Sequence, residues 1–166
     1  TVFKLFVSED HPGVLYLYIL DETLVNPVIV KTKNSRARPD EIIWERVAKS
    51  PKEGWIMDLV VDKSESDQFY LVYNDASPDQ RILFFDGTNY QDESGDLGYL
   101  VAESLMCDNG KNRLYLGTNH GVYTKLIGET NWTLLEGLPG TYIKTMAINK
   151  VTNMLYVGTY GRGVWK

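Results

Sequence analysis

The chain contains 166 residues, of which 43% are hydrophobic and 23% are charged, and this composition excludes disordered, collagen-like and membrane-spanning proteins. The net charge of −5 argues against nucleic acid as a partner, because phosphate backbones are bound by positively charged surfaces. With one cysteine, Cys107, and two histidines, His11 and His120, the sequence predicts no intrachain disulfide, no metal site and no cofactor.

The chain begins with a strand pattern. Residues 1–10 alternate in polarity and lack the form of a signal peptide. No stretch approaches the run of about 18 apolar residues that a spanning helix needs, so we expect no membrane insertion.

A strand–turn–strand pattern occurs four times along the chain. Each copy has a tyrosine flanked by apolar residues, preceded by an apolar pair and a polar turn, and the four copies align without a gap. The tyrosines are Tyr16, Tyr70, Tyr115 and Tyr156, and the apolar pairs are Phe6-Val7, Val60-Val61, Leu105-Met106 and Met146-Ala147. The repetition predicts an inner hairpin in each of four structural units.

Two further elements are expected after each hairpin. A turn rich in Asn, Asp or Gly leads to a third short strand, and a fourth element then ends in an aromatic residue. These aromatic residues, interpreted as packing residues, are Trp44, Tyr90 and Trp132. The fourth copy stops at Lys166 before such an element. The units therefore span about 1–53, 54–98, 99–139 and 140–166.

Four-stranded units of about 40 to 45 residues are typical of the blades of a β-propeller. We therefore predict an all-β fold, a β-propeller with three complete four-stranded antiparallel blades and a three-stranded last blade. A β-sandwich is the rival fold, but it would not require the copies to resemble one another. Residues 39–49 leave a local alternative, because their apolar pairs also have the spacing of a helix.

Residues 86–90 (Asp-Gly-Thr-Asn-Tyr) and 128–132 (Gly-Glu-Thr-Asn-Trp) resemble the Asp-box, Ser-x-Asp-x-Gly-x-Thr-Trp, of sialidases, sortilin-type receptors, xyloglucanases and photosystem assembly factors. Residues 155–165 are likewise similar to the last blades of that superfamily. The box is degenerate, since no copy keeps both its Ser and its Asp. The resemblance implies the propeller fold and an extracytoplasmic location (secreted, periplasmic or cell surface), whereas a fold does not identify an activity.

Propellers usually have four to eight blades, so we interpret the chain as the carboxy-terminal half of a ring of seven or eight blades, the others lying on another polypeptide or removed. An open blade face would expose side chains such as Phe6, Leu15, Met146 and Tyr156, at about 2 kcal/mol each. We expect a partner to cover these faces. Three arrangements remain open: a complementary propeller fragment, a second copy of the chain, or a four-bladed ring that closes on itself.

The loops that join second to third strands, and each blade to the next, share one edge of a propeller, and loops on a rigid scaffold generally carry function. The candidate ligand-binding residues on this edge are Asp75, His120, Tyr160 and Arg162. His120 has no identified nucleophile or orienting acid beside it, so a turn residue is favoured over a general base. Tyr160 is a candidate for stacking on a sugar ring.

Four charged residues occupy one column early in the innermost strands. They are Lys4, Asp58, Glu103 and Lys144. Because innermost strands line the channel, these residues could form a ring of alternating sign that binds a polar or zwitterionic group. A solvated channel wall is the simpler interpretation, since charges about 10 Å apart in water interact by only about 0.4 kcal/mol.

Two functions remain. The favoured hypothesis is a non-catalytic propeller scaffold that binds a protein or a glycan through its loop face and central channel. The alternative is the carboxy-terminal half of a propeller glycoside hydrolase, sialidase-like or xyloglucanase-like, with one catalytic carboxylate from Asp58, Asp75 or Glu103. Its partner would lie in the missing blades, because glycosidases need two carboxyl groups about 5 to 9.5 Å apart.

Overall fold

The structure is a computed structural model that describes residues 2–8, 11–20, 26–62, 67–74, 79–108, 110–149 and 151–166. These residues form fifteen β-strands in four antiparallel sheets, and no helix is found among them. Three sheets have four strands and the last has three, which confirms the predicted all-β fold and the composition of its units. Asp75 lies outside the described residues.

Each sheet keeps its strands in chain order from the inner to the outer edge. The first contains β1 (Val2–Val7), β2 (Leu15–Ile19), β3 (Val28–Thr32) and β4 (Glu45–Lys49). The second contains β5 (Ile56–Val61), β6 (Phe69–Tyr73), β7 (Ile82–Phe85) and β8 (Tyr90–Asp92). The third contains β9 (Ala102–Asp108), β10 (Arg113–Thr118), β11 (Gly121–Leu126) and β12 (Thr133–Leu134). The last contains β13 (Ile143–Asn149), β14 (Met154–Thr159) and β15 (Val164–Trp165).

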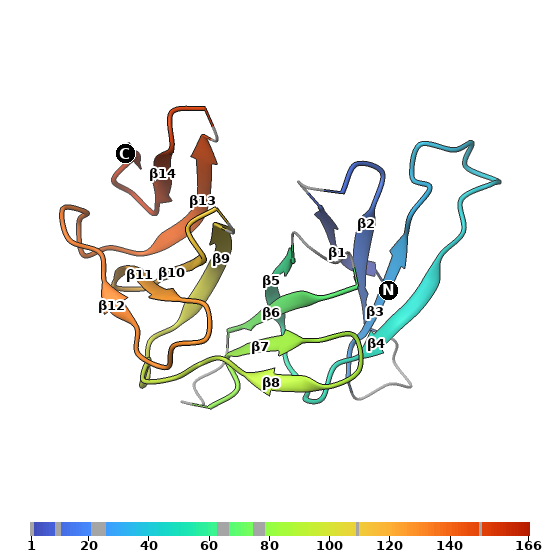
Figure 1. The fold of residues 1–166 in the computed structure, drawn as a ribbon, viewed down its shortest axis with the longest axis horizontal. Coiled ribbons are helices and arrows are strands. Elements are labelled where there is room, and N and C mark those ends of the chain that lie inside the picture. Colours follow the sequence, from blue (N-terminus) through green and yellow to red (C-terminus); the bar gives the residue numbers. More distant parts are fainter. Residues whose placement is uncertain are drawn as a thin grey trace.

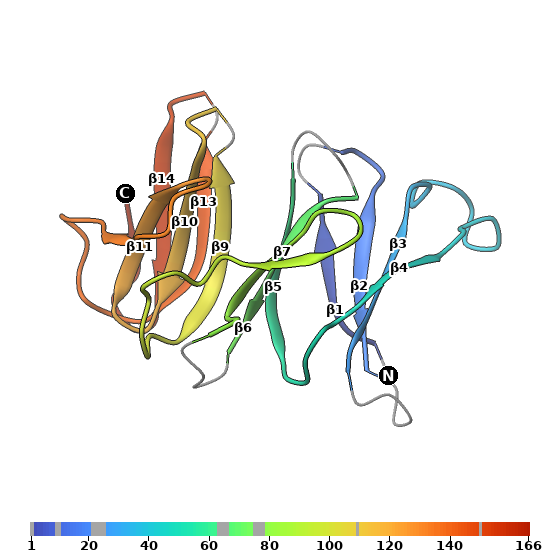
Figure 2. The same ribbon diagram turned by 60° about the horizontal axis from the view of Figure 1, so that its bottom comes forward.

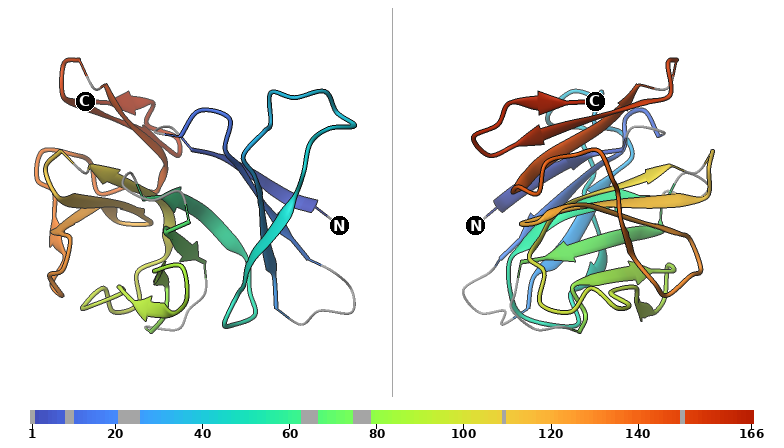
Figure 3. Two further views of the ribbon diagram at one scale, coloured as in Figure 1. Left: turned by 45° about the vertical axis from the view of Figure 1, so that its right-hand side comes forward. Right: turned by 90° about the vertical axis from the view of Figure 1, so that its left-hand side faces the viewer.

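The four sheets stand as blades around an open arc, with β1, β5, β9 and β13 innermost (Figure 1). Figure 2 shows that these inner strands run in roughly the same direction, each beside the next. The first and last blades form the two ends of the arc and carry the two termini (Figure 3). This radial arrangement of antiparallel sheets is that of a β-propeller.

The second strands show how the blades cover one another. Successive side chains of a strand point to opposite faces, so a strand covered on one face alternates in burial. In the first blade β2 alternates in this way, with Tyr16 and Tyr18 buried. In the second blade β6 is buried at every position, because other blades cover both of its faces.

Three apolar cores fill the gaps between consecutive blades. In the first core the edge of the Tyr16 ring meets Phe69, with ring centroids 5.7 Å apart. The second core contains Tyr70 together with Leu114, and the third contains Tyr115 together with Val157. The repeated tyrosine of each of these blades therefore points at the following blade.

The structure corrects the predicted identity of two side chains on the open faces. Phe6 is buried in the core between the first two blades, and Met146 packs into the core between the last two. The open faces instead carry their neighbours Leu5 and Ala147, because adjacent residues of a strand point in opposite directions. Leu15 and Tyr156 do lie on the open faces, where Leu15 is half-buried and Tyr156 is exposed.

The helical alternative for residues 39–49 is wrong. Residues 39–41 form a turn and β4 begins at Glu45, because Ala48 pairs with Ile29 of β3 and is buried in the first core. The outer strands also begin at or after the aromatic residues that were expected to end them. Tyr90 and Trp132 pack into cores as predicted, but Trp44 remains 41% exposed.

Candidate functional site

The inner strands of all four blades line one cleft of about 240 Å³ on the channel side of the arc. The first blade contributes Ser8, the second Asp58, the third Ser104 and the last Thr145. The described lining thus combines hydroxyl groups and a carboxylate with apolar side chains, a mixture that suits a polar ligand.

Asp58 joins the second blade to the third. Its Oδ1 accepts a hydrogen bond from the backbone N–H of Leu59 at 3.0 Å, and its Oδ2 accepts one from the N–H of Leu105 at 2.9 Å. Burial raises the pKa of the Asp58 carboxyl above its ordinary value, while the Leu105 N–H and the charge of Lys4 act in the opposite direction. The carboxylate is therefore held in place by the neighbouring blade.

Lys4 performs the same task between the first two blades. Its ammonium group donates a hydrogen bond to the carbonyl oxygen of Met57 in β5, and it lies 5.1 Å from the centre of the Phe6 ring. Lys4 is otherwise exposed on the channel side. One of its donors is thus used across the boundary between the blades.

Glu103 lies at the centre of a polar cluster that spans three blades. Its Oε1 accepts hydrogen bonds from the Tyr142 hydroxyl at 2.5 Å and from the Asn74 amide at 3.3 Å. Its Oε2 pairs with the Lys144 ammonium at 3.1 Å, and that ammonium lies 4.5 Å from the centre of the Tyr142 ring. Burial raises the pKa of Tyr142 to about 12, and its bond to Glu103 acts in the same direction.

Strand register separates the four charged residues into two kinds of position. Lys4 and Asp58 pair directly with Tyr18 and Val72 of the second strands, whereas Glu103 and Lys144 lie where the register shifts at a β-bulge. The turns before Leu114 and Leu155 are one residue shorter than those before Leu15 and Phe69, so the alignment without a gap is offset there. The four residues nevertheless follow one another along the channel, each in contact with an adjacent blade.

The described loop candidates share one edge but belong to different hairpins. His120 and Arg162 are exposed in turns of the third and last blades. The His120 N–H donates to Thr118 Oγ1 at 3.0 Å, and the Arg162 carbonyl accepts from Trp165 Nε1 at 2.9 Å. Tyr160 follows β14 directly, and its N–H donates to the carbonyl of Tyr142 at 2.8 Å, beside the start of β13.

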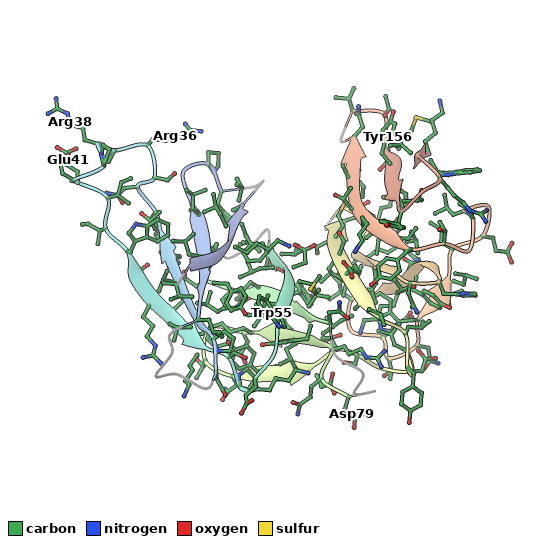
Figure 4. All side chains as sticks on the ribbon, turned by 180° about the vertical axis from the view of Figure 1, so that it is seen from behind. Arg36, Arg38, Glu41, Trp55, Asp79 and Tyr156 are labelled. Atoms are coloured by element: carbon green, nitrogen blue, oxygen red, sulfur yellow. The ribbon has the colours of Figure 1, made fainter. Side chains whose placement is uncertain are left out.

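Sequence reasoning missed two aromatic residues on this edge. Trp55 and Tyr99 lie on the crossings into β5 and β9 and are 60% and 80% exposed. Figure 4 shows Trp55 near the middle of the arc, beside the inner strands. Each follows a glycine with a positive φ, Gly54 or Gly98, and this glycine–aromatic pair at a crossing was the available signal.

The described part of the chain offers neither a cluster of metal ligands nor a membrane-spanning helix. No group of three or more His, Cys, Asp or Glu side chains is placed there to hold a metal ion. None of its segments forms a helix of the length and apolar character needed to cross a bilayer.

The chain shares its fold with solved structures. The extracellular domain of a hybrid two-component system from B. thetaiotaomicron matches 90% of the chain, with a TM-score of 0.58 and 14% identity. A structural genomics protein of unknown function from Bacteroides thetaiotaomicron VPI-5482 matches 95% of the chain, with a TM-score of 0.59 and 13% identity. YCF48 from Cyanidioschyzon merolae matches 98% of the chain, with a TM-score of 0.53 and 15% identity.

The fold is a β-propeller. The chain spans 19%, 38% and 65% of the lengths of these three structures, and at such identities the likeness concerns the fold alone. No protein-family model matches the chain, and no curated protein matches its sequence.

Proposed function

We propose that this propeller chain is a non-catalytic scaffold that binds a protein or a glycan at its loop edge and in the channel cleft. Three exposed aromatic residues on one edge, Trp55, Tyr99 and Tyr160, carry the proposal. Their rings offer flat apolar surfaces with a polar group at the rim, which suits stacking on a sugar or packing on a peptide. The hydroxyl groups of Ser8, Ser104 and Thr145 in the cleft would meet the polar groups of such a ligand.

The other candidate contacts fit around this aromatic set. In the proposal His120 and Arg162 join Tyr160 at the rim, while Lys4, Asp58, Glu103 and Lys144 form the wall of the channel. Asp75, which lies outside the described residues, stays a candidate from the sequence alone. Lys144 and Lys4 are exposed and able to shift toward a bound anionic group. Asp58 and Glu103 would act mainly by keeping the inner strands in register.

The hydrogen bonds of the two described carboxylates favour the scaffold over the glycoside hydrolase. Both oxygens of Asp58 accept backbone N–H groups, and both oxygens of Glu103 accept side-chain donors. A general acid or nucleophile must instead turn an oxygen toward the substrate. Both groups therefore support a structural role between blades.

An extracytoplasmic location is part of the proposal. One of the similar structures is an extracellular domain, which agrees with an exported protein. Ligands in that location include surface glycans and secreted proteins, both of which an open aromatic edge can contact.

The test is a binding screen of the chain on an array of β-glucan and sialoside oligosaccharides and on a phage-displayed peptide library. The triple variant Trp55→Ala, Tyr99→Ala, Tyr160→Ala should weaken binding by at least about tenfold, since aromatic anchors dominate such contacts. Trp44→Ala is the matched control, because Trp44 is also exposed but precedes β4 at the opposite edge.

Two results would contradict the proposal. One is the absence of binding to either library, or binding that the triple variant leaves intact. The other is release of sugar from the oligosaccharides that Asp58→Asn or Glu103→Gln abolishes, which would establish the hydrolase instead.

A further inference from the structure

The exposed apolar surface of the loop edge consists of aromatic rings. In the described part of the chain, the large hydrophobic residues exposed on this edge are Trp55, Tyr99 and Tyr160. The exposed large aliphatic residues lie instead on strands or at the opposite edge, and they are Leu5, Val7, Ile43, Leu134, Val151, Met154 and Val164. The loop edge thus lacks the aliphatic groove into which peptide side chains and amphipathic helices bind.

Backbone hydrogen bonds between the loops of the edge hold two of these aromatic residues. The carbonyl oxygen of Trp55 accepts the N–H of Asn74 at 3.4 Å, and the N–H of Tyr160 donates to the carbonyl oxygen of Tyr142 at 2.8 Å. In both cases the turn between the second and third strands is bonded to the crossing that enters the same blade. Trp55 and Tyr160 therefore lie at corresponding levels of the edge, in the second blade and in the last.

The three aromatic residues belong to three successive blades. Trp55 lies on the crossing into the second blade, Tyr99 lies on the crossing into the third, and Tyr160 follows β14 of the last. These blades stand side by side in the arc (Figure 1), and sheets that pack face to face lie about 10 Å apart. A ligand that contacts all three residues must therefore be an extended chain, longer than one sugar ring or one amino-acid side chain.

Charge limits the kind of chain that can approach this edge. The protein has a net charge of −5, so it repels a polymer with many negative groups. Exposed residues of both signs occur on the edge, as Glu53 and Arg162 show. An uncharged chain with hydroxyl groups avoids the repulsion, because a hydroxyl group both donates and accepts hydrogen bonds.

We propose that the loop edge binds an extended, uncharged polysaccharide across the second, third and last blades. The inference rests on the proposed function and specifies its ligand. The flat C–H faces of the sugar rings stack on Trp55, Tyr99 and Tyr160, and the sugar hydroxyl groups bond to polar side chains between these rings. His120 of the third blade is such a side chain, since it is exposed at this edge.

The first experiment is affinity gel electrophoresis of the chain in gels that contain neutral β-glucan, xylan, mannan or galactan. We expect at least one of these polymers to retard the chain. Retardation by none of them would overturn the inference. If displayed peptides bind through the same aromatic residues while no polysaccharide does, the inference fails and the proposed function stands.

The second experiment measures how affinity depends on chain length. Calorimetric titration uses oligomers of the retarding polymer, from disaccharide to hexasaccharide. Affinity should rise by at least about tenfold over this series, because each further blade that the chain reaches adds a contact without a new association step. An affinity that is the same for all lengths would overturn binding across several blades.

Variants of one end residue test the same geometry. Trp55→Ala removes the contact at the second blade, so it should weaken binding of the longest oligomer by about tenfold and reduce the gain from lengthening, while Trp55→Phe keeps a ring and should restore most of the affinity. Trp44→Ala at the opposite edge is the matched control and should change neither. Equal weakening of short and long oligomers by Trp55→Ala would contradict an extended ligand.

Discussion

Asp58 shows how one side chain links two blades at an electrostatic cost. Its oxygens hold backbone N–H groups of β5 and β9, yet burial raises the pKa of the carboxyl. The folded chain therefore retains this proton to a higher pH than the unfolded chain does. The stability that Asp58 contributes is fully present below its ordinary pKa of 3.8 and is lost as the pH rises through the raised value.

This linkage predicts how Asp58→Asn alters the pH dependence of stability. The free energy of unfolding of the unmodified chain, minus that of the variant, should be largest at acid pH and should decrease as the pH rises, because the amide does not titrate. Urea denaturation of both proteins at several pH values measures this difference. A difference that is constant or increases with pH would mean that the folded chain does not raise this pKa.

The crossings between blades are the elements on which the interfaces depend. The crossing from β8 to β9 contacts the third blade at Trp132, the last residue of the turn 128–132. The Trp132 N–H donates to Asp96 at 2.7 Å, and its indole N–H donates to the carbonyl of Glu93 at 3.3 Å. Lys125 pairs with Glu93 at 2.5 Å and lies over the Trp132 ring. The predicted packing role of Trp132 is therefore confirmed, and its contacts join the crossing to the third blade.

Gly95 lies where the crossing from β8 to β9 comes close to the backbone of Thr130, and Gly98 on the same crossing provides a matched control. A Cβ atom at Gly95 would lie 1.9 Å from the carbonyl oxygen of Thr130, and its φ is +56°. Gly98 on the same crossing has a φ of +59° but open space around it. Gly98→Ala should therefore cost about 1 kcal/mol from backbone strain alone, and Gly95→Ala about 1–3 kcal/mol more from the clash.

Thermal or urea denaturation of the two glycine variants measures these costs. Equal destabilisation by both substitutions would show that the crossing does not press against the third blade. A larger loss for Gly95→Ala than for Gly98→Ala would support the close contact of this crossing with the turn at Thr130.

At the scale of the whole molecule, the four blades form an open arc whose inner strands line one channel. Much of this architecture could be predicted from the repeats. The four tyrosine strands, the order of strands within each blade and the short last blade follow from local patterns of alternation and turn residues, which neighbouring residues determine. The candidate site was less predictable. The exposed aromatic residues Trp55 and Tyr99 follow ordinary crossing glycines, and Asn74 and Tyr142 join Glu103 only through contacts between blades.

The sequence by itself determined the blades, because a blade is a run of consecutive strands whose alternation and turns are local properties. Only the tertiary structure decided which side of each strand is covered, since Leu5 and Phe6 are both large and apolar and differ only in which blade they face. It also decided the inner-strand register, because one residue fewer in a turn moves Glu103 and Lys144 onto a β-bulge. Burial and charge contacts depend on neighbours that are distant in the chain, so local sequence patterns do not predict them.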